Sequence, residues 1–462
     1  MKKQILYTLC LAVMMSSCHI YKKYNRPENI NVSGLYRDTQ SVSDTLVSDT
    51  ANMGNLPWDQ VFTDPYLQEL INKGLENNSD LKTAALQVKE AEAMLLSARL
   101  AYAPSLNLAP QGTISSFDKS PITKTYQLPV VASWEIDFFG KLLNSKRAAQ
   151  NTLMKSETYR QVVQTQLIAA IANTYYTLLM LDEQLTITEE TSEKWKETVE
   201  TMKAMKPAGM VNEAAISQSE ANSYMIAATI PDLKMQIRET ENALSLLLGQ
   251  IPQTIKRGNI VEQNFPEEMD AGVPVQLLAN RPDVKAAELT LAGCYYNTNE
   301  ARSAFYPSIN ISGNGMWTNT ATGLGVFNPG KLILSAVGSL TQPLFNRGAN
   351  IARLRVAKAQ QEEALIAFQQ SILNAGSEVS NALTQYKTAE DKSVQRSMQI
   401  NSLEKSVEYT KELLILGTSS STYLEVLTAQ QSLLSAQLSQ VSDSFQRMQA
   451  IVNLYHALGG GR

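Results

Sequence analysis

Apolar residues recur at alternating spacings of three and four over long stretches of the chain, which is the heptad pattern of helices that pack side by side. The clearest stretch lies near the carboxyl end and contains Leu424, Leu427, Gln431, Leu434, Leu438, Val441, Phe445, Met448, Val452 and Tyr455. Two further stretches are Ile226, Ile230, Leu233, Ile237, Thr240, Leu244 and Leu247, and Leu365, Phe368, Ile372, Ala375, Val379, Ala382, Tyr386 and Ala389. Each predicts a helix with one apolar stripe and one polar face.

The predicted helices are unusually long. Residues 141–206 contain neither Gly nor Pro, and as one helix they would extend about 100 Å. Residues 349–416 form a second such run, interrupted only by Gly376. Return helices are expected at 211–248, with a kink or break at Pro231, and at 420–458. An earlier helix is predicted over 75–103, where Pro104 stops it. Helices of this length are typical of coiled-coil-like arrays.

Four segments alternate with a period of two and predict strands at 104–117, 126–139, 307–318 and 331–345. The second places Leu128, Val130 and Trp134 on one face and Ser133 and Glu135 on the other. The first is weaker because Pro110 and Gly112 interrupt it. Apolar-out, polar-in strands of about ten residues are typical of transmembrane β-barrels. Aromatic residues near the strand ends would form interfacial girdles: Trp134, Phe138, Phe139, Trp317 and Phe345.

The same plan occurs twice in the chain. Residues 98–108, which include Ala-Pro-Ser-Leu-Asn-Leu, are repeated as residues 301–311, which include Tyr-Pro-Ser-Ile-Asn-Ile. Leu247-Leu248-Gly249 closes one copy and Ala457-Leu458-Gly459 closes the other. We therefore expect two duplicated halves, 61–250 and 273–459, joined by a linker at 251–272. A period this long is not that of a solenoid.

Four strands cannot close a barrel in lipid, because the smallest such barrels have eight. An open edge would leave unpaired backbone groups in the membrane. Several chains must therefore contribute, and the pattern alone does not choose between two, three or four copies. A lipid-anchored periplasmic coiled-coil scaffold or adaptor is the main alternative. It would explain the heptads, but not four alternating strands at duplicated positions.

The amino end predicts export and lipid attachment. Residues 1–17 have the positive, apolar and small-residue regions of a signal peptide, and Cys18 stands at the cleavage position. This resembles a bacterial lipoprotein signal, in which Cys18 would carry a diacylglycerol and an N-acyl chain and anchor residues 18–60. The alternative is an ordinary signal with an incidental cysteine. Cys294, the other cysteine of the mature chain, lies in an apolar helical stretch and is expected to be buried and inert.

Composition argues against nucleic-acid binding and catalysis. The net charge is -4 and the pI about 5.6, so no basic face is indicated. The two histidines, His19 and His456, lie far apart without a metal-binding pattern. Gly313 and Gly315 lie in a strand pattern without the following helix that a phosphate loop needs. We therefore expect no catalytic residues, no metal and no cofactor beyond the lipid on Cys18.

Several motifs, in order, resemble the lipoprotein branch of the TolC-like bacterial outer-membrane efflux family. They are Tyr24-Asn25-Arg26-Pro27, Phe62-Thr63-Asp64-Pro65-Tyr66-Leu67, Asn280-Arg281-Pro282-Asp283-Val284-Lys285, Tyr423-Leu424-Glu425-Val426-Leu427 and Val452-Asn453-Leu454-Tyr455. The resemblance covers nearly all of the mature chain. It implies a mainly α protein with a small membrane β part. Three chains would form a twelve-stranded outer-membrane barrel, continued by a periplasmic barrel of twelve helices.

The resemblance also implies partners. A periplasmic adaptor would join the helical end to an inner-membrane pump, expected to be proton-driven, which supplies the free energy. The protein itself would conduct passively, in an efflux system or, alternatively, as a type I protein secretion duct. The adaptor-docking residues would lie at two helix turns: Ala208, Gly209 and Met210, and Leu416, Gly417 and Thr418.

A gate is expected beside the second turn, where relatives often carry an acidic residue. Here Ser419 and Ser420 stand at that place, which departs from the family pattern and puts an acidic gate in doubt. Glu213 and Glu425 are the nearest carboxylates and complete the set of gate candidates. Either carboxylate has a simpler explanation, as a solvated acidic residue in the first turn of a helix.

Overall fold

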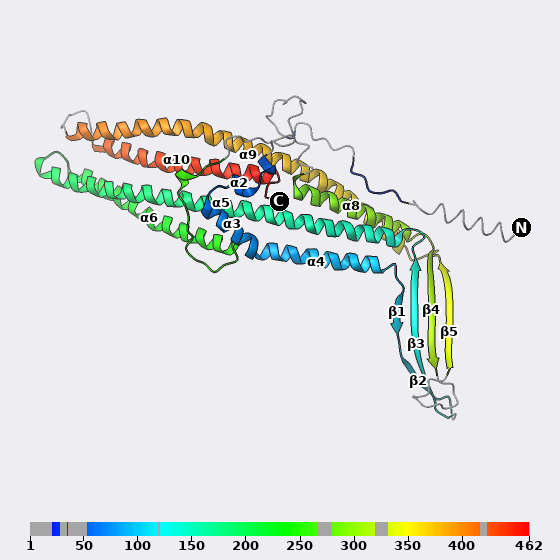
Figure 1. Ribbon diagram of the computed structural model, residues 1–462. Coiled ribbons are helices and arrows are strands. Elements are labelled where there is room, and N and C mark those ends of the chain that lie inside the picture. The colour runs from blue at the N-terminus through cyan, green and yellow to red at the C-terminus, as the bar shows by residue number, and fades with distance from the viewer. Residues whose placement is uncertain are drawn as a thin grey trace. The chain divides into compact units, whose positions relative to one another are not determined.

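The computed structural model of the chain describes residues 21–27, 35, 53–118, 121–265, 280–318, 331–415 and 423–461. Most of these residues are helical, and one sheet is formed by five strands (Figure 1). The chain divides into two units by the contacts between its residues. The first comprises residues 1–30, 86–158 and 285–370 and contains the sheet. The second comprises residues 31–85, 159–284 and 371–462.

Four helices are long: α5 (Lys141–Met205), α6 (Glu213–Leu247), α9 (Ala349–Ile415) and α10 (Tyr423–Ala457). α5 and α9 have 65 and 67 residues, and their bounds differ by one residue from those expected. The shorter elements are η2 (Met53–Asn55), α2 (Trp58–Val61), α3 (Pro65–Asn77), α4 (Ser79–Leu100), η3 (Lys206–Ala208), η4 (Ile260–Glu262) and α8 (Pro282–Ser303).

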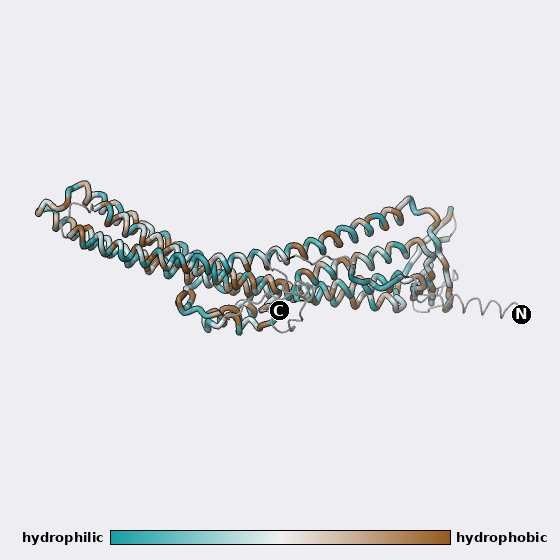
Figure 2. The backbone as a smooth tube through the Cα atoms, turned by 90° about the horizontal axis from the view of Figure 1, so that it is seen from above, coloured by the Kyte–Doolittle hydropathy of each residue, from teal (hydrophilic) through white to brown (hydrophobic). Residues whose placement is uncertain are grey.

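The heptad stripes are where the helices bury their side chains. On α9, the buried residues Phe368, Ile372 and Val379 follow the predicted spacing. On α5, α6 and α10, Trp195, Ile226 and Leu427 form one buried cluster. Hydrophobic and hydrophilic residues alternate along all of these helices (Figure 2). The predicted arrangement of an apolar stripe and a polar face is therefore confirmed for α6, α9 and α10, except at Leu424, which is 66% exposed.

The helix predicted over residues 75–103 is interrupted by Asn78. The Asn78 side chain accepts hydrogen bonds from the backbone N–H groups of Asp80 and Leu81, at 2.9 and 3.0 Å. It therefore caps the start of α4, and α3 ends one residue before it. The prediction considered only the absence of Gly and Pro and missed the capping sequence Asn78-Ser79-Asp80.

Pro231 does not end its helix. α6 continues through it from Glu213 to Leu247, and Pro231 lies on an exposed part of the surface. An interior proline removes one backbone hydrogen bond, and a helix of 35 residues retains enough others to continue. Of the two expectations at this position, a kink or a break, the break is therefore wrong.

The sheet has the strands β1 (Ser105–Leu108), β2 (Gln111–Ser115), β3 (Thr123–Ile136), β4 (Ser308–Thr318) and β5 (Lys331–Thr341). β3 pairs with β1, β2 and β4, and β4 pairs with β5, all antiparallel. The pairing of β3 with β4 joins the two duplicated halves in one sheet. Figure 1 shows the strands running side by side.

The first predicted strand, 104–117, is in fact two strands. β1 ends at Leu108 and β2 begins at Gln111, and between them the Ala109 N–H donates to the Pro129 carbonyl at 3.2 Å. The Pro129 carbonyl accepts this hydrogen bond, but Pro129 has no N–H group with which to donate a second one to Ala109. Pro110 adds a second residue without a donor. The two prolines together explain the break, which the sequence had indicated only as a weakness.

The duplication is visible in atomic contacts. In the first half, the Asn78 amide donates to the Leu247 carbonyl at 2.9 Å, and in the second the Arg281 guanidinium donates to the Ala457 carbonyl at 3.0 Å. A Cβ at Gly249 would lie 2.7 Å from the Asn77 carbonyl oxygen, and one at Gly459 would lie 2.7 Å from the Asn280 oxygen. Both glycines also have positive φ, which disfavours other residues. The sequence matches at these positions therefore preserve one type of helix junction.

Arg281 explains why the Asn-Arg-Pro-Asp motif takes this form. Its side chain is 4% exposed and forms ion pairs with Asp283 and Glu378, each at 2.6 Å. With the bond to Ala457, it links the start of α8 to α9 and to the end of α10. A buried guanidinium needs this number of acceptors, because an unpaired charge is costly in the interior.

Candidate functional sites: a helix turn and an exposed apolar sheet

The first helix turn, residues 206–212, is built by local backbone rules. α5 passes into η3, and Gly209 follows with φ at 73°. The Gly209 N–H donates to the Lys206 carbonyl at 2.9 Å, which satisfies an acceptor at the helix end. Asn212 then caps α6, because its side chain accepts from the Ala215 N–H at 2.8 Å. The turn is thus a tight glycine C-cap followed directly by an asparagine N-cap.

The turn exposes its predicted docking residues. Ala208, Gly209 and Met210 are all exposed, and the Met210 side chain is 46% exposed. Behind them, Met202, Val211 and Ile216 form a buried cluster against which Tyr423 packs. The predicted docking residues therefore project from a packed support. An exposed methionine beside a glycine with no neighbour within 4 Å of its Cβ position leaves an accessible apolar surface.

Charged pairs surround the turn. Lys206 pairs with Glu213 at 2.5 Å, and Lys203 pairs with Glu220 at 3.0 Å and with Glu200 at 3.1 Å. The hydrogen bonds that Lys203 donates to the Glu220 and Glu200 carboxylates raise the pKa of Lys203. Glu213 and Glu425, two of the gate candidates, lie in the first turns of α6 and α10. Both placements agree with solvated helix-start residues that favour the helix dipole.

The second turn lies outside the described residues. α9 ends at Ile415 and α10 begins at Tyr423. Leu416, Gly417 and Thr418, predicted to dock an adaptor, fall between them, as do the gate candidates Ser419 and Ser420. Cys18 and the predicted signal peptide also lie outside the described residues.

One face of the sheet is apolar, and none of the residues that the structure describes covers it. In register across the strands, Leu128 pairs with Trp317, Trp134 with Ile311, and Ile309 with Leu340. Leu334 and Leu340 are 76% and 69% exposed. The intervening positions pair polar residues, such as Ser133 with Ser312 and Asn314 with Ser335. The predicted alternation is confirmed, and an exposed apolar surface of this kind marks an interaction with a partner or a membrane.

Aromatic residues cluster where the sheet meets the helices of its unit. Phe139 stacks on Tyr306 with ring centroids 5.0 Å apart, and Phe138 contacts Phe139 edge-on. The Trp134 indole donates to the Tyr102 carbonyl at 2.8 Å. Sequence reasoning found three of these residues but missed Tyr102 and Tyr306, which lie in turns rather than in strands. Trp317 lies near the opposite end of the strands, and Phe345 is 87% exposed.

The amino-terminal motif, residues 21–27, lies along α8. Arg26 forms two hydrogen bonds with the Glu288 carboxylate, at 2.8 and 2.5 Å. The Tyr24 ring meets Tyr295 edge-on, and burial, followed by the charge of Glu288, raises the pKa of Tyr24 to about 12. Tyr21 lies beside Gly140, at the start of α5, where a Cβ would be 3.5 Å from the tyrosine ring. The motif was recognised in the sequence, but its position along α8 was not predicted.

Cys294 is a free thiol on α8 and is only partly buried, which corrects the expectation of a buried residue. Its pKa is raised, mainly by burial, so the less reactive thiol form is favoured. Within the described ranges, no helix is both long and apolar enough to cross a membrane. The same residues contain no cluster of His, Cys, Asp and Glu suited to a metal ion.

Comparison with known proteins gives a consistent result. Residues 70–250 and 273–460 match the model of a family described as outer membrane efflux protein. The cation efflux system protein CusC of Escherichia coli is 29% identical over 463 residues, which cover 99% of this chain and 98% of that protein. The probable outer membrane lipoprotein SilC of Salmonella typhimurium is 29% identical over 87% of this chain and 88% of that protein.

A solved structure also matches. It is the open state of the MtrE outer membrane channel of Neisseria gonorrhoeae, which is similar with a TM-score of 0.84 and 27% identity. The match covers 96% of this chain and 98% of that one. The similarity therefore includes both the sheet and the long helices.

Proposed function

The chain belongs to the outer membrane efflux protein family, and on that premise we propose that it is the outer-membrane channel of a tripartite efflux system. It conducts substrates passively and carries no catalytic site. A periplasmic adaptor and an energised inner-membrane pump complete the system. The substrate class is selected by the pump, because the polar strand positions of this chain are mostly uncharged serine, threonine and asparagine residues that carry little substrate information.

The exposed apolar face of the sheet carries this proposal. In a periplasmic scaffold the apolar side chains of this sheet would face water, which is unfavourable for an apolar surface of this kind. Lipid covers such a face at no cost, provided that the strand edges are paired. The sheet has two edges, at β5 and at the β1–β2 side. Other copies of the chain must pair with them.

Three copies of the chain would supply enough strands to close a barrel without free edges. β1 and β2 are two parts of one strand position, so that each chain contributes four positions and three chains contribute twelve. Twelve antiparallel strands are an even number within the range of known outer-membrane barrels, whereas two copies would give only the minimum of eight. The four long helices of each chain likewise give twelve, which form a hollow periplasmic barrel.

The amino-terminal motif supports lipid attachment at the membrane surface. Cys18 precedes Tyr21 by three residues, which span at most about 10 Å. Tyr21 lies beside Gly140, close to the aromatic residues Phe138 and Phe139. Aromatic side chains are enriched at membrane interfaces, where their rings meet the head groups. A diacylglycerol and an N-acyl chain on Cys18 would therefore enter the bilayer at the level of this cluster.

The helix turns serve as the adaptor-docking tips. Ala208, Gly209 and Met210 are exposed on a packed support, as docking requires. Leu416, Gly417 and Thr418 are the matching residues of the second tip. The gate lies beside them, at Ser419 and Ser420, with Glu213 and Glu425 as the nearest carboxylates. Lys206 forms an ion pair with Glu213. The pair reduces the negative electrostatic potential that the Glu213 carboxylate can contribute in a pore.

Oligomeric state and membrane association test the proposal together. The protein is extracted from membranes in detergent, its mass is measured by light scattering, and its migration in SDS gels is compared with and without heating. The expected result is a trimer that migrates differently after heating. A protein recovered as a water-soluble monomer or dimer would refute the barrel and favour the coiled-coil scaffold.

A further inference from the structure

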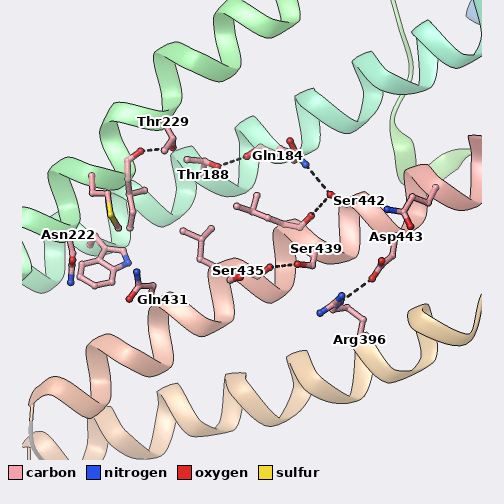
Figure 3. Close-up of a pocket in the computed structure, with 16 residues that line it drawn as sticks. Gln184, Thr188, Asn222, Thr229, Arg396, Gln431, Ser435, Ser439, Ser442 and Asp443 are labelled. Carbon is pink, nitrogen blue, oxygen red and sulfur yellow. Dashed lines mark hydrogen bonds and ion pairs between the residues drawn. The ribbon is translucent and has the colours of Figure 1, made fainter. Parts of the chain in front are cut away.

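The second unit contains a cavity of about 550 Å³ to which the proposed channel function assigns no role. It is lined by residues of α5, α6, α9 and α10 (Figure 3). Its volume lies within the range of pockets that hold small organic molecules. Asn222 and Gln431 lie at one end of the cavity in Figure 3, and Arg396 and Asp443 at the other.

The cavity has an unused hydrogen-bond donor. Trp195 lines it and is 1% exposed, and its indole N–H has no acceptor among the described residues. Buried indole N–H groups normally find a partner, because an unpaired donor in the interior is costly. A molecule that placed an acceptor atom beside Trp195 would remove this cost. Nonpolar contacts are available from Met225, Ile226 and Leu434.

The two charged residues of the cavity lining, Arg396 and Asp443, are paired with each other. Arg396 donates to the Asp443 carboxylate at 3.0 Å, and Lys392 lies 3.9 Å from the same carboxylate. Gln184 and Ser442 are also joined across the cavity, at 3.4 Å. A charged ligand would therefore have to compete with an existing ion pair, whereas an uncharged one would not.

We propose that this cavity is a binding site for a small, uncharged amphipathic molecule that accepts a hydrogen bond from Trp195 and packs its nonpolar body against Met225, Ile226 and Leu434. The site lies among the four long helices rather than at a tip or in the sheet. It goes beyond the proposed channel function, and binding can be measured without conductance or transport.

The test uses the full chain in lipid nanodiscs and the dye Prodan, an uncharged naphthalene with one ketone oxygen. Binding is measured by equilibrium dialysis, with empty nanodiscs of the same lipid as the baseline for partitioning. We expect saturable binding of one dye per chain above the baseline. Ser439→Trp places a large side chain in the cavity and should abolish that binding. Ser432→Trp, on the same helix but outside the lining, should leave it intact.

Trp195→Phe provides a second variant, which keeps a six-membered aromatic ring but removes the N–H together with the five-membered ring of the indole. Loss of one hydrogen bond should weaken Prodan binding about 3- to 10-fold. Trp58→Phe, in α2, is the matched control and should bind as the wild type does. Absence of saturable binding by the wild type would overturn the proposal. So would undiminished binding by both Ser439→Trp and Trp195→Phe.

Discussion

At the scale of single residues, Arg281 is the side chain that joins several helices of the second unit. It connects three helices through Asp283, Glu378 and the carbonyl of Ala457. Arg281→Ala leaves that carbonyl without its partner, while the carboxylates, which are 40% and 48% exposed, can be hydrated. We expect a loss of about 1–3 kcal/mol of stability, measured by denaturant unfolding.

Arg353→Ala is the control for Arg281→Ala. Arg353 is 54% exposed and pairs with Glu300 at 2.7 Å. Exposed ion pairs contribute about 0–1 kcal/mol, so this variant should unfold nearly as the wild type does. Equal losses from both arginine substitutions would show that Arg281 does not hold the junction.

Gly376 and Gly293 are both interior helix glycines, but their surroundings differ. A Cβ at Gly376 would lie 2.7 Å from the Leu35 side chain and 3.2 Å from its carbonyl oxygen, whereas one at Gly293 would meet nothing within 4 Å. Alanine is favoured over glycine in a helix by about 1 kcal/mol. Gly293→Ala should therefore raise the melting temperature, and Gly376→Ala should lower it or leave it unchanged. A rise in both variants would contradict the Leu35 contact.

His456 gives a dependence of stability on pH. Burial is the main cause that lowers its pKa, and the charge of Arg281 adds to it, while Glu378 and Asp283 act in the opposite direction. As the pH falls below about 6.5, the unfolded chain gains a proton before the folded chain does. The neutral His456 side chain therefore makes its full contribution to stability above about pH 6.5, and this contribution declines as the pH falls toward the lower pKa of the folded state. The free energy of unfolding at pH 7.5 and 5.5 should differ less in His456→Gln than in the wild type.

At this scale the sequence could identify motifs but not their contacts. The Asn-Arg-Pro-Asp motif and Gly376 were both noticed in the sequence, yet neither Glu378 nor Leu35 could be named as a partner. Those partners are 97 and 341 positions away, and no local pattern encodes a contact at such a separation.

At the scale of elements, the tip defined by η3 and the start of α6 depends on one cap. Asn212→Ala removes the acceptor for the Ala215 N–H, at a cost of about 1 kcal/mol. The expected result is faster hydrogen exchange at residues 213–216, with no change in the middle of α6. Asn212→Asp keeps an acceptor and should exchange as the wild type does. Unchanged exchange in the alanine variant would show that the cap does not hold this turn.

Element lengths were largely predictable because glycine, proline and heptad spacing act locally. The bounds of α5 and α9 were predicted within one residue. It failed at Asn78, where a side-chain cap breaks a helix without glycine or proline, and at Pro231, where a proline is tolerated. It also could not foresee that Pro129 faces Ala109, because that pairing depends on the register of two strands.

At the scale of the whole molecule, the duplication fixes how one sheet is assembled. β3 of the first half pairs with β4 of the second, so neither half forms the sheet alone. Repetition of the plan was visible in the sequence, but this pairing was not. The proposed trimeric channel would pair the two remaining strand edges and place the exposed apolar face against lipid.

Planar-bilayer conductance, measured on protein whose trimeric mass has been established, tests that account most directly. We predict discrete conductance steps, because in the proposed trimer three chains would enclose a continuous water-filled path through the bilayer. The steps should persist in Arg353→Ala, which alters only an exposed ion pair. A protein that inserts no conducting unit into the bilayer and is recovered from solution as a monomer would contradict the channel.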